Sequence, residues 1–80
     1  MRVYIANTES GQRFTCNKRK LLVEGEQDAG EWWVDEVHMG EYARDGEGNI
    51  TFMDGSGTDV HTFNAEDEDA WKEFARKVLL

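Results

Sequence analysis

Two short segments that begin with Asp-Gly, DGEGN (45–49) and DGSG (54–57), constrain the fold of this chain most strongly. They flank ITFM (50–53), and the second leads into TDVHTF (58–63). Asp-Gly between alternating segments is the strongest local signal for a β-hairpin, because these residues tolerate the positive φ angles of tight turns. This part of the chain is therefore predicted to form antiparallel strands joined by tight turns.

The first third of the chain also has the pattern of short strands. RVYIA (2–6) alternates between apolar and exposed positions, and after the turn-forming NTESG (7–11) the alternation resumes in QRFTC (12–16). A basic connection, NKRK (17–20), then leads into LLVEGE (21–26), a short apolar segment typical of a strand.

The segment EWWVDEVHMGEYAR (31–44) is compatible with two structures. Asp28 followed by Glu31 resembles the capping box of a helix. The many aromatic and β-branched residues favour a strand instead. A strand would place Trp32 and Trp33 on opposite faces of the sheet, so that only one of them lies under a covering helix.

The C-terminal segment has the signals of a helix. Asn64 is a good N-cap, and Asp67 follows at the spacing of a capping box. The four consecutive acids at 66–69 suit the positive end of a helix dipole. An apolar stripe at helical spacing follows, made by Ala70, Trp71, Phe74, Ala75 and Val78. Helix formation therefore accounts for most of the acidity of this segment.

These segments predict one α+β domain over residues 1–80, an antiparallel β-meander of about five strands with the C-terminal helix packed on one face. A five-stranded barrel closed by the helix is the alternative. Residues 50–78 resemble the ends of small meander-plus-helix domains such as the single-strand-binding transcriptional coactivators. Those coactivators use basic residues on the sheet, which this segment lacks, so the resemblance implies a fold and no function.

Known catalytic and metal-binding patterns are missing from the sequence. A calcium loop starting at Asp54 would place Ala65 where a bidentate glutamate is needed, and the glycines lack the Lys-Ser/Thr pair of a phosphate loop. His38, His61 and Cys16 have no partner at metal-site spacing. We therefore expect no cofactor, no metal and no enzymatic activity.

The expected location is the cytoplasm. Cys16 is the single cysteine, which excludes an intramolecular disulfide, and small secreted domains usually depend on disulfides. The apolar run near the N-terminus is too short for a signal peptide, and no segment has the roughly 18 apolar residues of a membrane span.

Charge is distributed unevenly along the chain. The net charge is −8, and residues 21–71 hold fifteen acids but a single base, Arg44. Such crowding of one charge opposes compaction, and it also allows a surface to attract a basic partner. Direct binding to nucleic acid is not expected, because the phosphates would be repelled.

We therefore predict a small non-catalytic protein that binds a basic, nucleic-acid-binding surface of a partner protein. In size and acidity the chain is similar to phage-encoded inhibitors of the anti-CRISPR or DNA-mimic kind. The alternative is a housekeeping regulatory module, with a homodimer left open, whose acidity serves solubility. The candidate partner-binding residues are a tryptophan and the acids of the meander: Trp32, Asp35, Glu36, Glu41, Asp45, Glu47, Asp54 and Asp59.

Overall fold

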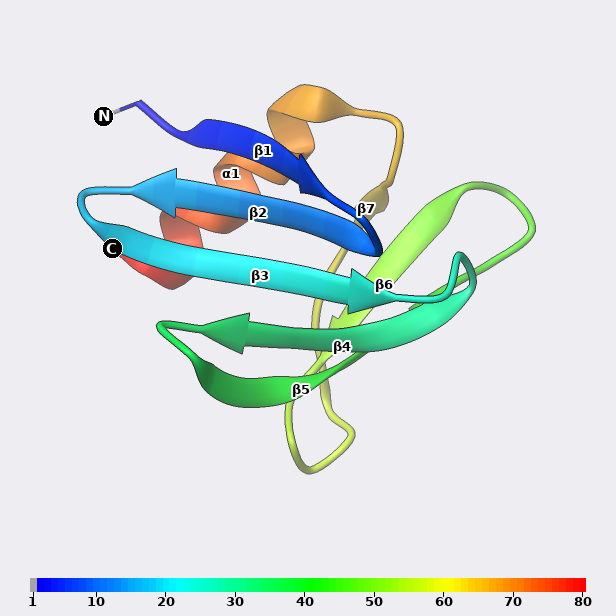
Figure 1. Cartoon of the computed structure of the whole chain (residues 1–80). Coiled ribbons are helices and arrows are strands. Elements are labelled where there is room, and N and C mark those ends of the chain that lie inside the picture. The colour runs from blue at the N-terminus through cyan, green and yellow to red at the C-terminus, as the bar shows by residue number, and fades with distance from the viewer. Residues whose placement is uncertain (1) are drawn as a thin grey trace.

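In a computed structural model, which describes residues 2–80, the chain forms seven β-strands followed by one helix (Figure 1). The elements are β1 (Tyr4–Thr8), β2 (Gly11–Cys16), β3 (Arg19–Gly25), β4 (Ala29–Val34), β5 (Val37–Arg44), β6 (Asn49–Met53), β7 (Asp59–Asn64) and α1 (Glu68–Leu79). Each strand pairs antiparallel with the next, so the order in the sheet is the order in the chain. The sheet curls into a half-barrel, and α1 packs inside the curve against β2, β3 and β7.

The prediction of about five strands was wrong, and so was the alternative of a five-stranded barrel. The largest error lies in residues 31–44, which form β4 and β5 instead of one strand. A tight turn separates them, in which Asp35 and Glu36 have φ angles of 49° and 70°. Neither residue is glycine, so the sequence lacked the usual marker of such a turn.

The turn between β2 and β3 has the same backbone form, with φ angles of 57° at Asn17 and 67° at Lys18. The turn at Asp35 is bonded to the first residues of β3. The Asp35 carboxylate accepts hydrogen bonds from Arg19 Nε and from the Lys20 backbone N–H, both at 2.9 Å. These bonds fix the two neighbouring turns to each other, which offsets the cost of positive φ at residues other than glycine.

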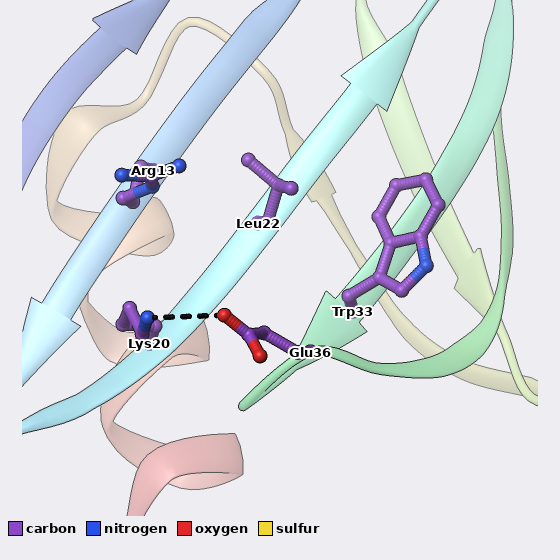
Figure 2. Close-up of a pocket in the computed structure, with 5 residues that line it drawn as sticks. All are labelled: Arg13, Lys20, Leu22, Trp33 and Glu36. Atoms are coloured by element: carbon purple, nitrogen blue, oxygen red, sulfur yellow. Dashed lines mark hydrogen bonds and ion pairs between the residues drawn. The ribbon is translucent and has the colours of Figure 1, made fainter.

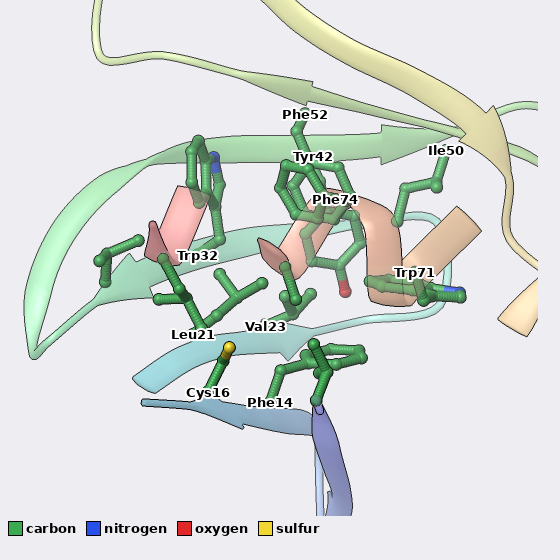
Figure 3. Packing of buried hydrophobic residues seen from close by; sticks show 14 residues of the cluster. Phe14, Cys16, Leu21, Val23, Trp32, Tyr42, Ile50, Phe52, Trp71 and Phe74 are labelled. Carbon is green, nitrogen blue, oxygen red and sulfur yellow. The ribbon is translucent and has the colours of Figure 1, made fainter. Parts of the chain in front are cut away.

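The core lies between the concave face of the sheet and α1 (Figure 3). Phe52 is fully buried at its centre and stacks on Phe74 with ring centroids 4.2 Å apart. The polar atoms of the buried aromatic side chains donate hydrogen bonds to the backbone. The indole N–H of Trp32 donates to Met53 O at 2.9 Å, and the Tyr42 hydroxyl donates to Glu26 O at 2.8 Å. The core is thus largely aromatic, and its polar atoms are satisfied.

The N-cap of helix α1 lies three residues later than predicted. Asp67 is the N-cap and accepts a hydrogen bond from Ala70 N at 3.2 Å, whereas Asn64 accepts one from Glu66 N within the preceding turn. The buried face consists of Trp71, Phe74, Ala75 and Leu79. Within residues 2–80 no helix has the length and apolar character to cross a membrane.

β5 pairs with β6 over three residue pairs only, from Tyr42 to Arg44 on the β5 side. Closer to its start, β5 approaches the backbone of Met53 so tightly at Gly40 that a Cβ atom on Gly40 would overlap the Met53 carbonyl oxygen. That oxygen also accepts the Trp32 indole hydrogen bond. Glycine is therefore required at this position by close approach of two backbone segments.

Candidate functional site

The meander gathers alternate connections at the same end of the sheet, because consecutive strands run in opposite directions. The connections at 9–10, 26–28, 45–48 and 65–67 share one end with the start of α1 (Figure 1). Three backbone hydrogen bonds link them in order: Gly25 N to Ser10 O (3.1 Å), Arg44 N to Asp28 O (2.8 Å) and Ala65 N to Gly48 O (2.8 Å). The four connections therefore form one continuous surface.

This surface is acidic. We define the acidic end as residues 9–10, 26–28, 45–48 and 65–69, which include the first two residues of α1. It holds no lysine or arginine and more than half of the acids of the chain: Glu9, Glu26, Asp28, Asp45, Glu47, Glu66, Asp67, Glu68 and Asp69. Charges that are spread over 60 residues of sequence are thereby concentrated on one part of the molecule.

The loop at 45–48 is held rigidly by its own aspartate. Asp45 Oδ1 accepts hydrogen bonds from the backbone N–H groups of Glu47 (2.8 Å) and Asn49 (3.0 Å), and the Asn49 side chain donates to Oδ2 at 3.1 Å. These bonds, led by the one from the Asn49 backbone, lower the pKa of Asp45. Asp45 therefore stays ionised and presents the neighbouring Glu47 in a fixed loop.

The base closest in sequence to this loop is Arg44, at the end of β5. It lines a hollow of about 340 Å³ together with Asp28, Asp45 and Glu66. Its Nε atom is buried without a hydrogen-bond partner among the described residues. None of the ion pairs of the described residues includes Arg44, and in this hollow its single positive charge faces three carboxylates of the acidic end.

The opposite end of the sheet carries most of the bases. Arg19 pairs with Asp35 at 2.9 Å and Lys20 pairs with Glu36 at 3.5 Å. The backbone hydrogen bond from Lys20 and the side-chain bond from Arg19 lower the pKa of Asp35. Of the predicted partner-binding acids, Asp35 and Glu36 therefore lie beside bases of their own chain.

The other predicted residues are scattered. Asp45 and Glu47 lie together in the acidic end, whereas Asp54 lies in the turn between β6 and β7 at the other end of the sheet. There the Asp54 carboxylate accepts hydrogen bonds from Ser56 and Thr58, and these lower its pKa. Glu41 lies on the outer side of β5 opposite Glu31, and Asp59 begins β7.

Trp32 was predicted as a surface anchor, and its position in the structure makes that prediction wrong. Its side chain is 3% exposed, in edge contact with Phe52 and in tilted contact with Phe74. The neighbouring Trp33 points to the convex face instead, as alternation along a strand requires. It makes an edge contact with His38 at a centroid distance of 5.5 Å.

Trp33 lines a shallow groove of about 300 Å³ on the convex face, with Arg13, Lys20, Leu22 and Glu36 (Figure 2). We call it the convex groove. The sequence indicated that one of the two tryptophans faces outward, but it did not place bases from β2 and β3 next to it. That juxtaposition depends on the strand register.

Among residues 2–80, no three histidine, cysteine, aspartate or glutamate side chains are placed to hold a metal ion together. Cys16 is buried in the core as a free thiol. His61 packs edge-on against Phe74, and burial, followed by the charge of Lys77, lowers its pKa.

The acidic end predicts a salt response of stability. Raising ionic strength from 0.01 M to 0.15 M shortens the Debye length from about 30 Å to about 8 Å and weakens repulsion among the crowded carboxylates. We expect the melting temperature, measured by circular dichroism, to rise by several degrees over this range. The triple variant Glu26→Gln, Glu47→Gln, Glu66→Gln should show a flatter response. An equal rise in both proteins would show that the repulsion lies elsewhere.

The surface of this protein thus has two distinct features. The acidic end concentrates one charge on connections that are bonded to one another. The convex groove combines an indole ring with two bases on the side of the sheet facing away from α1. Comparison of the chain with protein-family models, with curated proteins and with solved structures found no match.

Proposed function

We propose that this protein is a non-catalytic binder that uses its acidic end to occupy a basic, nucleic-acid-binding surface of a partner protein. The observation that carries the proposal is the gathering of nine carboxylates at one end of the sheet, on four connections and the first two residues of α1, where Arg44 at the end of β5 is the base that shares a hollow with them. Surfaces that bind nucleic acid collect lysine and arginine against phosphates. A rigid array of carboxylates offers such a surface a competing anion.

The rigidity of the acidic end supports this function. Hydrogen bonds between successive connections hold the loops against one another, and the Asp45 bonds fix the loop at 45–48. A surface that is ordered before binding loses less conformational entropy in the complex. Clustered charge of one sign also accelerates the encounter with a partner of opposite charge.

Charge reversal in the acidic end tests the proposal. A partner is first captured from host lysate and identified, and its affinity is then measured by surface plasmon resonance at two salt concentrations. The triple variant Glu26→Lys, Glu47→Lys, Glu66→Lys should bind at least about tenfold more weakly, chiefly through slower association that depends less on salt. Nucleic acid that binds the partner should compete with the unmodified protein.

A matched variant changes the same number of charges outside the acidic end. Glu31→Lys, Glu41→Lys, Asp59→Lys alters three exposed acids on the strands and should leave the affinity within about twofold of the unmodified protein. A loss of affinity confined to this variant would place the binding surface on the strands. If neither variant changes affinity and nucleic acid does not compete, mimicry of nucleic acid is refuted and a regulatory interaction module remains.

A further inference from the structure

The convex groove is built from three neighbouring strands. Arg13 on β2 is paired in register with Leu22 on β3, and Leu22 is paired with Trp33 on β4. Paired strands lie about 4.8 Å apart, so these side chains form a continuous row across the sheet. Lys20 stands two residues before Leu22 and therefore projects from the same face. Figure 2 shows Leu22 between Arg13 and Trp33, with Lys20 and Glu36 closing one side.

The groove carries an excess of positive charge. The Lys20 ammonium pairs with the Glu36 carboxylate at 3.5 Å, and this glutamate side chain is 85% exposed. Arg13 takes part in none of the ion pairs of the described residues. After the Lys20–Glu36 pair is counted as neutral, the guanidinium of Arg13 remains as an unmatched charge next to an apolar floor.

The types of side chain in this row are those that dominate protein–protein binding energies. Tryptophan and arginine are enriched among the few interface residues that contribute most to affinity. Here the Trp33 ring is half-buried, and its indole N–H has no hydrogen-bond partner among the described residues. Leu22 lies between the ring and the guanidinium and adds apolar surface to the groove. The row can therefore accept an apolar side chain and an anion side by side.

We infer that the convex groove is a docking site for an extended acidic peptide segment of a partner protein. One apolar side chain of that segment packs on Leu22 and Trp33, and a neighbouring carboxylate pairs with Arg13. The excess positive charge at Arg13 favours a ligand that carries a negative charge. The groove volume of about 300 Å³ is at the lower end of the range for small-ligand pockets, which suits one large side chain.

Two other occupants fit the groove less well. The adjoining row of acids, Glu24, Glu31 and Glu41, which are in register with one another, repels any anion that follows the strands. A polynucleotide carries a charge on every nucleotide and would meet that row, whereas a short peptide can lie across the strands along Arg13, Leu22 and Trp33. The acidic end of a second copy would supply carboxylates but no apolar anchor. The large apolar side chains that are exposed all lie outside the acidic end: Tyr4, Val37, Met39, Val60 and Leu80.

The test uses a defined probe, the blocked peptide Glu-Asp-Leu-Phe-Asp-Glu, in a titration followed by two-dimensional NMR of the ¹⁵N-labelled protein. We expect saturable shifts at the amides of Arg13, Lys20 and Leu22 and at the indole N–H of Trp33. A peptide with serine in place of leucine and phenylalanine should bind about tenfold more weakly or not at all. A peptide with lysine in place of every acid should leave these signals unchanged.

Two variants of equal charge change isolate the groove. Arg13→Glu should weaken binding of the acidic peptide by about tenfold or more. Lys77→Glu makes the same change on α1, on the other side of the sheet, and should leave binding unchanged. Thermal melts establish that both variants are folded. Leu22→Ser removes the apolar floor of the groove without changing its charge and should also weaken binding of the acidic peptide.

Each of four results would overturn the inference: no saturable shift at the groove, equal binding of the serine peptide, equal binding to Arg13→Glu, or shifts that follow protein concentration without peptide. The last result would assign the groove to a second copy. A decathymidylate that binds the groove in place of the peptide would assign it to nucleic acid. Because Arg13 lies outside the acidic end, these outcomes are independent of the charge-reversal experiment on the proposed function.

Discussion

Replacement of Trp71 by alanine is expected to lower the free energy of unfolding by about 3–5 kcal/mol. The ring is 6% exposed and stacks on Phe14 at a centroid distance of 5.3 Å, with an edge contact to Phe63 at 5.1 Å. Its indole N–H also donates to Ala65 O at 2.7 Å, so truncation leaves that carbonyl without this donor. A domain of this size has a total stability of only about 4–12 kcal/mol, so the loss is severe.

Urea unfolding followed by circular dichroism measures this effect. Tyr4→Ala is the matched control, because Tyr4 is also a large aromatic residue but is 62% exposed on β1. The control should change the free energy of unfolding by no more than about 0.5 kcal/mol. If Trp71→Ala and Tyr4→Ala unfolded at similar urea concentrations, the result would show that α1 does not contribute its aromatic face to the core.

Introduction of a single methyl group at Gly40 is expected to destabilise the fold by about 3 kcal/mol or more, above the usual cost of overpacking. The new Cβ atom of Gly40→Ala would overlap the Met53 carbonyl oxygen, and the overlapping atom belongs to the backbone. Relief of the overlap requires Met53 to move, which strains its hydrogen bond with the Trp32 indole at 2.9 Å. The close approach of β5 to Met53 at the end of β6 would be lost.

Gly46→Ala provides the control for this substitution. Gly46 lies in the loop between β5 and β6, and a Cβ atom there would have no neighbour within 4 Å. Its φ angle is outside the left-handed region, so alanine is tolerated and should change stability by less than about 1 kcal/mol in either direction. Thermal melts of the two variants give the comparison. Equal melting temperatures would refute close approach at Gly40.

The sequence predicted the helix better than the sheet. The apolar stripe correctly included Trp71, Phe74 and Ala75, because a spacing of three to four residues leaves few alternatives. The cap was placed at Asn64 instead of Asp67, since both residues have side chains that accept backbone hydrogen bonds. Local chemistry does not distinguish a helix cap from the turn that precedes it.

The strand count failed at turns without glycine. Asp35-Glu36 and Asn17-Lys18 adopt positive φ angles that are stabilised by contacts between the two turns, through Asp35 with Arg19 and Lys20. Those contacts are formed by residues about 16 positions apart in the sequence, so no local pattern contains them. The Asp-Gly turns at 45–46 and 54–55, by contrast, were correctly read as breaks between strands.

The error in the strand count also prevented the acidic end from being predicted from the sequence. Whether two connections lie at the same end depends on whether the number of strands between them is even or odd. Division of residues 31–44 into two strands brings the loop at 45–48 to the end that holds 26–28. The sequence therefore identified an excess of acids but could not assign them to a surface, and it could not place Arg13 beside Trp33.

The pairing of every strand with its neighbour in the chain has a consequence for how the protein folds. Each hairpin closes a short loop, so its pairing has a small entropic cost, and sheets built from such local pairs form quickly. The packing of α1 on β2 and β3 joins segments more than 40 residues apart, as in the hydrogen bond from Arg19 to Leu79 O at 3.2 Å. We therefore expect the docking of the helix to follow formation of the sheet and to be the step that makes unfolding of the domain cooperative.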